Sequence, residues 1–255
     1  MPASAAVAAE AMAKGGATRF SGTTVETTRR DLTKGPIIIP LQATPSTAIG
    51  PASGGVILQA PDAAAFVLAS ASPRRADLVR QIGLVPDHTE PAEIDETQRR
   101  GERPRLYAAR MALGKARAVA VRRPGCWVLA ADTVVACGIR ILPKAETEAE
   151  ARRCLALLSG RRHRVIGGVV LLAPDGAVRA REIETRVAFK RLDAAETAVY
   201  LASGEWRGKA GGYAIQGLAA AYVSFVNGSY SNVVGLPLAE TYGLLAGAGF
   251  RHAAG

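Results

Sequence analysis

The fold is decided by the stretch Leu68-Ala69-Ser70-Ala71-Ser72-Pro73-Arg74-Arg75-Ala76-Asp77-Leu78-Val79, where an apolar run ends in small polar residues and a helix begins. Ser72 is a favoured N-cap residue, and Pro73 suits the first helical position because its missing N–H would be unbonded there. Gly83 is a favoured residue just after a helix end. The pattern predicts a buried strand over residues 66–69 followed by a helix over residues 73–82.

Two arginines, Arg74 and Arg75, follow at once in the first turn of this expected helix. The N-terminus of a helix carries free N–H groups and the positive end of the helix dipole, so cations are unfavourable there unless an anion compensates them. A phosphate-bearing ligand would do so. A surface helix with solvated arginines explains the same residues equally well.

Beyond this stretch, apolar runs alternate with helical patterns, which is typical of an α/β domain. We expect a mixed β-sheet flanked by helices, with a substrate cleft, because a hairpin turn at Pro174-Asp175-Gly176 interrupts the strand–helix alternation. The expected helices and strands cover Arg105–Val121 (helix), Trp127–Val135 (strand), a capped helix from Thr147 to near Gly160, Val165–Leu172 and Val178–Phe189 (hairpin), a helix capped by Asp193, Ala221–Val226 (strand) and a last helix from Leu236-Pro237.

Composition separates two regions of the 255-residue chain. Residues 1–60 are rich in Ala, Thr, Pro, Gly and Ser and lack periodicity, so we expect a disordered N-terminal extension, followed by one domain over residues 61–255. The net charge of +10 favours anionic partners. Three cysteines without metal-ligand spacing, no long apolar segment and no secretory signal favour a cytoplasmic protein without membrane spans.

Asp132 is the candidate general base. It follows the apolar run Trp127-Val128-Leu129-Ala130-Ala131, so we expect its carboxylate at the mouth of the sheet, where α/β proteins place their sites. A carboxylate that only bonds its own turn is the alternative.

An acidic cluster, Glu93, Asp95 and Glu96, has the oxygen ligands that a hard cation such as Mg²⁺ prefers, although acidic loops are usually only solvated. Lys115 and Lys144 could direct charge at phosphate oxygens, or could be surface lysines. Together these parts indicate metal-assisted hydrolysis of a nucleoside polyphosphate, with water attacking phosphorus.

A glycine-flanked loop, Lys209-Ala210-Gly211-Gly212-Tyr213-Ala214-Ile215-Gln216-Gly217, allows a ligand to approach the backbone closely. Within it, Gln216 can offer both a donor and an acceptor to the edge of a base. The three histidines form no ligand pattern with one another or with the cysteines.

Five ordered motifs of the chain resemble those of the Maf nucleotide pyrophosphatases. They are Ala69-Ser70-Ala71-Ser72-Pro73-Arg74-Arg75, Ala131-Asp132-Thr133-Val134-Val135, Leu158-Ser159-Gly160-Arg161-Arg162-His163, Lys209–Gly217 and Gly228-Ser229-Tyr230-Ser231-Asn232-Val233-Val234-Gly235-Leu236-Pro237. The resemblance runs from about Phe66 to Phe250 and leaves the first 60 residues uncovered.

The resemblance implies an α/β fold related to inosine triphosphatases, which hydrolyses a nucleoside triphosphate to the monophosphate and pyrophosphate with Mg²⁺ or Mn²⁺, often as a homodimer. It further implies roles for individual residues. Asp132 is similar to the family's proton acceptor, and Glu96 is similar to its metal-binding or catalytic carboxylate. The residues similar to its phosphate and catalytic contacts are Ser70, Arg75, Lys115 and Lys144.

The substrate branch follows from three further positions of the resemblance. Arg74, Thr133 and Gln216 agree with the branch that acts on dTTP and UTP, whereas the 7-methyl-GTP branch carries Trp, Gln and Glu there. A neutral Gln suits the imide edge of a pyrimidine. Two departures from the family pattern are Ala145, where a proline usually follows the lysine, and Ala219, where a glycine is usual.

Two alternatives remain open from the sequence. The charge and the family's link to septum formation would also suit a protein that binds nucleic acid or the division machinery without hydrolysis. That protein would need a basic stripe or an aromatic stacking surface, and only 5% of the residues are aromatic, so nucleic acid is the less favoured partner. A hydrolase that prefers modified pyrimidine nucleotides is the second alternative.

Overall fold

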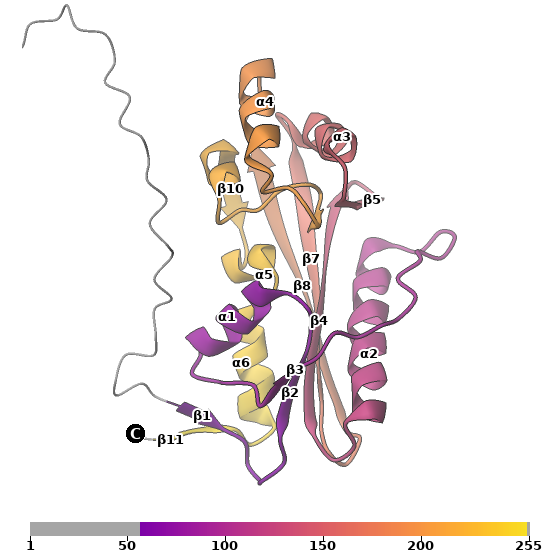
Figure 1. The fold of residues 1–255 in the computed structure, drawn as a ribbon, viewed down its shortest axis with the longest axis vertical. Coiled ribbons are helices and arrows are strands. Elements are labelled where there is room, and N and C mark those ends of the chain that lie inside the picture. The colour runs from indigo at the N-terminus through magenta and orange to yellow at the C-terminus, as the bar shows by residue number, and fades with distance from the viewer. Residues whose placement is uncertain (1–56, 254–255) are drawn as a thin grey trace, which may run out of the picture. The chain divides into compact units, whose positions relative to one another are not determined.

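A computed structural model describes residues 57–253, which contain a seven-stranded mixed sheet with helices on both faces (Figure 1). The strand order is β10-β8-β7-β4-β2-β3, and β5 pairs with β4 beside this path. The strands are β2 (Phe66–Ala69), β3 (His88–Thr89), β4 (Trp127–Cys137), β5 (Arg140–Leu142), β7 (Arg162–Leu172), β8 (Val178–Phe189) and β10 (Val223–Asn227). The expected α/β class with a mixed sheet is confirmed, since β2 and β3 run parallel to β4 and the other pairs are antiparallel.

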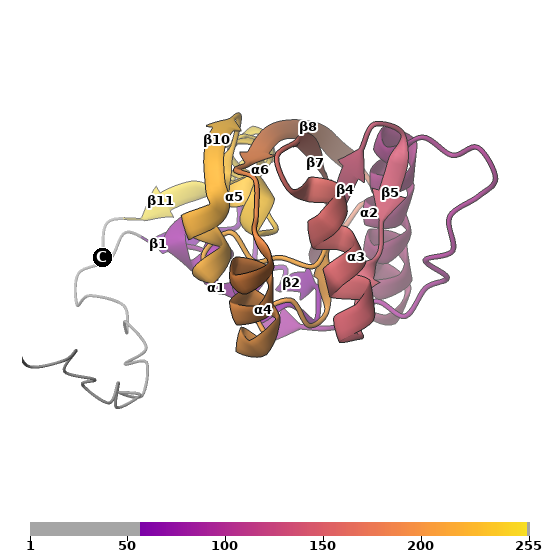
Figure 2. The ribbon, with the colours of Figure 1, turned by 90° about the horizontal axis from the view of Figure 1, so that it is seen from above.

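Six α-helices accompany the described part of the sheet. They are α1 (Pro73–Gln81), α2 (Pro104–Arg122), α3 (Glu148–Leu158), α4 (Ala194–Ser203), α5 (Tyr230–Val234) and α6 (Leu238–Gly247). Figures 1 and 2 show α2 on one side of the sheet and α1 with α6 on the other. None of the helices within residues 57–253 is long and apolar enough to cross a membrane.

Two helices begin at the capping residues that the sequence predicts. Thr147 and Asp193 each accept a hydrogen bond from the third residue of their helix, and Glu150 and Glu196 complete the two capping boxes. Ser72 is the N-cap of α1, but its side chain makes no capping bond; instead its own N–H donates to Ser70 Oγ at 3.1 Å.

The sheet face that packs on α1 and α6 carries two separate hydrophobic cores. One lies under α1 and α6 and includes Leu68 and Leu129; the other lies under α3 and α4 and includes Val135 and Val165. Thr133 lies on the strand between them and is only half-buried. The two cores therefore leave a space between them on this face of the sheet.

The strand β4 is confirmed over its expected residues 127–135 and continues for two more, to Cys137. Asp132 lies inside this strand, because the apolar run Val134-Val135-Ala136 keeps pairing with β7, so the alternative of a carboxylate that only bonds its own turn does not apply. The shorter neighbour β2 ends at Ala69, opposite Ala130, and β5 starts to pair only at Val135. One edge of β4 over residues 131–134 therefore lacks a neighbouring strand in the described part of the sheet, and Asp132 still lies just beyond the carboxyl end of β2.

Two adjacent glycines of β7 lie opposite this segment of β4, Gly167 across from Thr133 and Gly168 across from Asp132. A Cβ on Gly167 would lie 2.0 Å from Asn232 Oδ1, and one on Gly168 would lie 2.6 Å from the Ala108 carbonyl oxygen. Both distances are shorter than any allowed contact, so the missing side chains let α5 and α2 approach the sheet here.

Two small strands pair outside the main sheet, β1 (Ile57–Gln59) with β11 (Arg251–Ala253). The first of them falls within residues 1–60, which we expected to be disordered, so the ordered part begins before residue 61. Leu58 is buried in the core under α1 and α6. The rest of the expected extension lies outside the described residues.

Candidate functional site

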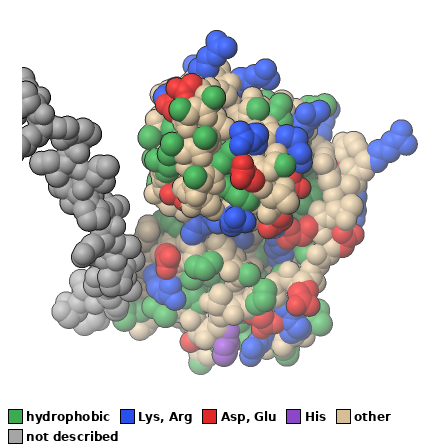
Figure 3. Space-filling view, turned by 45° about the horizontal axis from the view of Figure 1, so that its top comes forward, with side chains coloured by type: hydrophobic (Ala, Val, Ile, Leu, Met, Phe, Trp, Pro, Cys, Tyr) green, Lys and Arg blue, Asp and Glu red, His purple; other side chains and the backbone are tan. Residues whose placement is uncertain are grey.

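The space between the two cores is a cavity of about 520 Å³, bordered by the open edge of β4. Figure 3 shows a face of the protein that is hollowed across its middle, with Lys and Arg side chains along the hollow. Its lining comes from the loop before α1 and the first turn of that helix, from the loop of Glu96, from α2, from β4, from β6 (Lys144–Ala145) and β9 (Lys209–Ala210), and from the end of α5. The segments that carry the sequence motifs therefore meet at one place.

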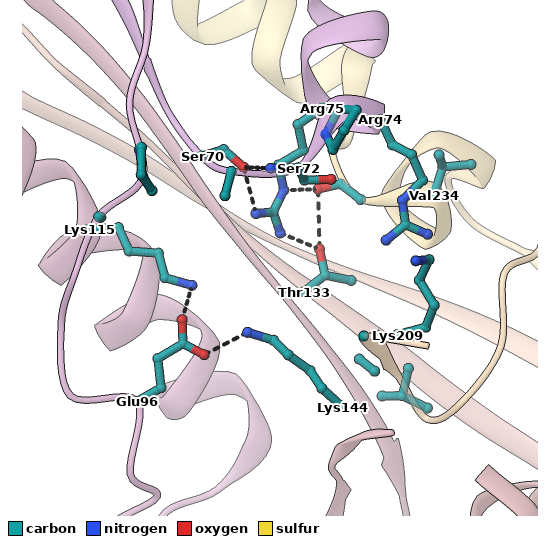
Figure 4. Close-up of a pocket in the computed structure, with 18 of the residues that line it drawn as sticks. Ser70, Ser72, Arg74, Arg75, Glu96, Lys115, Thr133, Lys144, Lys209 and Val234 are labelled. Atoms are coloured by element: carbon teal, nitrogen blue, oxygen red, sulfur yellow. Dashed lines mark hydrogen bonds and ion pairs between the residues drawn. The ribbon is translucent and has the colours of Figure 1, made fainter. Parts of the chain in front are cut away.

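Arg75 holds the centre of the cavity together (Figure 4). Its guanidinium donates to Gly235 O at 2.8 Å, to Ser70 Oγ at 3.2 Å and to Thr133 Oγ1 at 3.2 Å. All three acceptors are uncharged, and Arg75 forms no ion pair within residues 57–253. Burial lowers the pKa of Arg75, although nearby carboxylates act in the opposite direction. An anionic ligand would supply the missing countercharge.

A second group of charges lies at one end of the cavity and connects α2 with β4. Lys115 is buried, and its Nζ lies 2.6 Å from Asp132 Oδ1 and 2.7 Å from Glu96 Oε1. The other oxygen of Glu96 pairs with Lys144 Nζ at 2.7 Å. The structure thus brings together all four residues that the sequence predicted as catalytic.

Glu96 remains a carboxylate under ordinary conditions. Its partial burial raises its pKa, but hydrogen bonds from Lys115 and Lys144 outweigh that effect and lower the pKa to about 2. Asp132 is buried and bonds Lys115 through Oδ1 only, while its Oδ2 makes no hydrogen bond to another described residue. That oxygen is available to accept a proton from a bound water.

The expected acidic cluster does not converge as a whole. Glu93 and Asp95 are exposed, and Asp95 accepts a bond from the backbone N–H of Thr97, so only Glu96 of the three reaches the cavity. Some side chains of this loop face solvent and others face the cavity, and the spacing of the acidic residues in the sequence did not show which would do so. Residues 57–253 contain no group of three or more His, Cys, Asp or Glu side chains that could hold a metal by themselves.

Two carboxylates nevertheless fit a divalent cation. Glu96 and Asp132 approach each other closely enough that both bond the single Nζ of Lys115. Mg²⁺ is commonly held by one or two carboxylates together with substrate phosphates and water. This donor set therefore fits a metal that arrives with a phosphate ligand, and Glu96 remains its expected ligand.

Sequence reasoning missed Lys209, which lies at the other end of the cavity beside Arg74 (Figure 4). Burial and the neighbouring guanidinium lower the pKa of Lys209, and burial and Arg75 lower that of Arg74. β9 pairs with β6, so Lys209 and the predicted Lys144 belong to one small ladder. Its place at the start of the fourth motif was the available signal, but the motif alone did not show that Lys209 reaches the cavity, because the pairing of β6 with β9 is long-range.

Gln216 is not among the residues brought together. It is exposed and does not line the cavity, while Ile215 before it is buried in the core under α3 and α4. The next residues are held by Glu205, whose carboxylate accepts the N–H of Leu218 at 2.8 Å. Of the three expected specificity positions, Arg74 and Thr133 therefore face the cavity and Gln216 does not.

One wall of the cavity is fixed by a buried aromatic group. Tyr213 lines the cavity, and its hydroxyl lies 2.8 Å from His163 Nε2, which belongs to the third sequence motif. Phe189 packs edge-on against both rings. Burial lowers the pKa of His163 to about 4, so the imidazole is neutral near pH 7. His163 supports this wall through Tyr213 and does not itself line the cavity.

Comparison with known proteins shows which proteins this chain is similar to. The sequence model of the family described as "Maf-like protein" matches residues 65–248. The chain is 65% identical over 187 residues to a dTTP/UTP pyrophosphatase of Paramagnetospirillum magneticum, covering 73% of this chain and 98% of that protein. It is 62% identical to a dTTP/UTP pyrophosphatase of Caulobacter vibrioides, covering 73% and 97%. A solved nucleoside-triphosphatase, the dITP/XTP pyrophosphatase of Mycobacterium abscessus, overlaps 51% of this chain and 76% of its own at 20% identity and a TM-score of 0.35.

Proposed function

The chain belongs to the family of Maf-like proteins and is a nucleotide pyrophosphatase, and we propose on this basis that it hydrolyses dTTP and UTP to the monophosphate and pyrophosphate. The relatives that carry this activity in their names match almost their whole length to this chain.

The charge balance of the cavity is the observation that carries the proposal. Five cations line the cavity against the single lining carboxylate of Glu96, with Asp132 buried beside it: Arg74, Arg75, Lys115, Lys144 and Lys209. A nucleoside triphosphate carries several negative charges on adjacent phosphates, which complement such a surface. The loop before α1 adds backbone N–H groups at a helix N-terminus.

The reaction that these groups support is attack of water on the α-phosphorus. The water oxygen forms a bond to that phosphorus, and Asp132 accepts a proton from the water through its free oxygen. The bond between the α-phosphorus and the oxygen bridging to the β-phosphorus breaks, and pyrophosphate leaves with the electron pair. Lys115, Lys144 and Arg75 stabilise the negative charge that develops on the phosphates.

A divalent cation, Mg²⁺ or Mn²⁺, would supply charge neutralisation and polarise the phosphate oxygens. Glu96 would hold it together with the substrate phosphates, while Asp132 keeps its free oxygen for the proton of the attacking water. The expected consequence is that activity is lost when the metal is removed with a chelator and returns when Mg²⁺ or Mn²⁺ is added.

We further propose that Arg74, Thr133 and Gln216 select the pyrimidine substrates. We also propose that the enzyme hydrolyses modified pyrimidine nucleotides. Finally, we propose that it acts in the cytoplasm and forms a homodimer. Two of the three selecting residues face the cavity. For Gln216 to reach a base, its loop must adopt another conformation when substrate binds. Light scattering in solution tests the dimer directly.

The deciding experiment is a pyrophosphate-release assay across the four ribonucleoside and four deoxyribonucleoside triphosphates, followed by the Asp132→Asn variant. We expect dTTP and UTP to be preferred, and the variant to lose about 100-fold or more in kcat, as is typical when a general base is removed. Asp77→Asn is the matched control, because that carboxylate is exposed and pairs only with Arg80.

Full activity of Asp132→Asn would refute the role of Asp132. If the wild-type enzyme releases pyrophosphate from none of the nucleotides and instead binds nucleic acid in a salt-dependent way, the proposed hydrolysis itself is wrong.

A further inference from the structure

The end of the cavity that lies away from Glu96 has a different character from the catalytic end (Figure 4). Arg74 and Lys209 lie there side by side, and neither forms an ion pair with a carboxylate within residues 57–253. At the catalytic end, by contrast, Lys115 and Lys144 are both paired with Glu96. Within the described residues, these two cations therefore have no carboxylate partner, and Lys209 donates only to the carbonyl oxygen of Arg207.

The walls near this end are apolar. Tyr213 and Val135 belong to the core under α3 and α4, and Ala210, Val233 and Val234 pack against that core and line the cavity with them. The backbone after Lys209 approaches this wall closely, because a Cβ on Gly211 would lie 2.7 Å from Val135 Cγ1. Apolar walls suit the faces of a planar base, whereas a phosphate chain gains nothing from them.

The two cationic side chains at this end offer only donors. A guanidinium and an ammonium cannot accept hydrogen bonds, and Lys209 uses one of its three N–H groups on Arg207 O at 2.9 Å. The imide edge of uracil or thymine carries two carbonyl oxygens, which are acceptors, one on each side of the N3–H group. Cytosine carries an amino group in place of one of them, so the same site would set donor against donor.

We propose that Lys209, together with Arg74, donates hydrogen bonds to the carbonyl oxygens of the pyrimidine base and is a specificity-determining residue that excludes cytosine. The inference rests on the proposed pyrophosphatase function and adds an orientation of the substrate within the cavity. The base lies between the apolar walls at the Lys209 end, and the α-phosphate lies at the Asp132 end.

The test is the ratio of kcat/KM for UTP to that for CTP in three variants of this residue. We expect Lys209→Met to lower the ratio at least tenfold, because it removes the donors and keeps a similar length. Lys209→Arg should preserve most of the ratio. Lys209→Gln offers a carbonyl acceptor to the cytosine amino group, so it should raise kcat/KM for CTP, a gain that a poorly folded variant could not show.

Lys190→Met is the matched control, because Lys190 is exposed, pairs with Glu196 and does not line the cavity. Inhibition by inorganic pyrophosphate is measured in parallel, and its inhibition constant should change less than twofold in Lys209→Met. A raised inhibition constant with an unchanged UTP to CTP ratio would overturn the inference and make Lys209 a phosphate ligand. Failure of the wild-type enzyme to hydrolyse UTP or dTTP would instead refute the underlying function.

Discussion

At the scale of single residues, His163 shows how burial sets a charge state. The side chain is 2% exposed and bonded to Tyr213, and burial lowers its pKa from 6.5 to about 4. Between these two values the unfolded chain binds a proton that the folded protein does not. Stability is therefore complete above pH 6.5 and declines as the pH falls from 6.5 through 4.

The corresponding prediction concerns unfolding in urea between pH 7 and pH 4.5. Wild-type protein should lose free energy of unfolding across this range, toward a limit of about 3 kcal/mol at still lower pH. His163→Gln, which keeps a polar partner for Tyr213 but does not titrate, should lose less. His88→Gln, at an exposed histidine of β3, is the control and should behave as wild type. Equal slopes for wild type and His163→Gln would contradict the assignment.

The sequence predicted which residues lie near the site, but it did not predict which way all of their side chains point. Ser70, Arg75 and Asp132 belong to local motifs, and the structure gathers them at one cavity. Gln216 belongs to an equally good motif, yet its side chain is exposed, because a loop's direction depends on contacts outside the motif, such as the bond from Leu218 to Glu205. Lys209 enters the cavity through a strand pairing that no local pattern reveals.

At the scale of elements, the short helix α5 positions the guanidinium of Arg75. Asn232 in this helix is fully buried, and its Nδ2 donates to Val165 O and to Thr185 Oγ1, both at 3.1 Å. These bonds tie α5 to β7 and β8. The helix ends at Gly235, whose carbonyl accepts from both Arg75 and Thr133. The fifth sequence motif thus acts on the cavity through a helix end.

Asn232→Ala should therefore affect both folding and catalysis. The loss removes the bonds to Val165 O and to Thr185 Oγ1, although the latter still accepts from Ser229 N–H, so we expect the free energy of unfolding to fall by about 1–3 kcal/mol. A shifted Gly235 carbonyl should also raise KM for dTTP more than it lowers kcat, if Arg75 binds substrate as proposed. Asn227→Ala, at an exposed position of β10, is the matched control for both measurements. An unchanged KM in a folded Asn232→Ala protein would refute the positioning role.

The elements themselves were predicted well where their signals are local. Capping residues, the hairpin turn at residues 174–176 and the apolar runs of β2 and β4 all mark their own positions. The pairing of β4 with β2 and β7 and the pairing of β1 with β11 depend on partners more than 20 residues away. Periodicity within one segment carries no information about such partners.

At the scale of the whole molecule, the part that the sequence model matches, residues 65–248, is shorter than the part that must fold together. β1 lies before the matched range and β11 after it, and the buried side chain of Leu58 joins the core under α1 and α6. The boundary of the folded unit therefore includes this pair of strands.

Two truncations test this boundary. A chain that begins at residue 57 should keep the full-length kcat/KM for dTTP, because the cavity is built from residues 69–235. A chain that begins at residue 61 should melt at a lower temperature, since burial of Leu58 is worth about 2 kcal/mol. Loss of activity in the longer of the two truncated chains would show that the first 56 residues contribute to catalysis. Equal melting temperatures of the two truncated chains would show that β1 does not stabilise the fold.

A substitution at Gly168 would alter the site and leave every polar group of the cavity unchanged. Its missing side chain lets the backbone of α2 approach the sheet opposite Asp132, and α2 carries Lys115. A single added methyl group would therefore act as a spacer between the helix and the strand that carry the charge pair. A mutant library restricted to residues that line the cavity would never sample this position, although it sets the distance between Lys115 and Asp132.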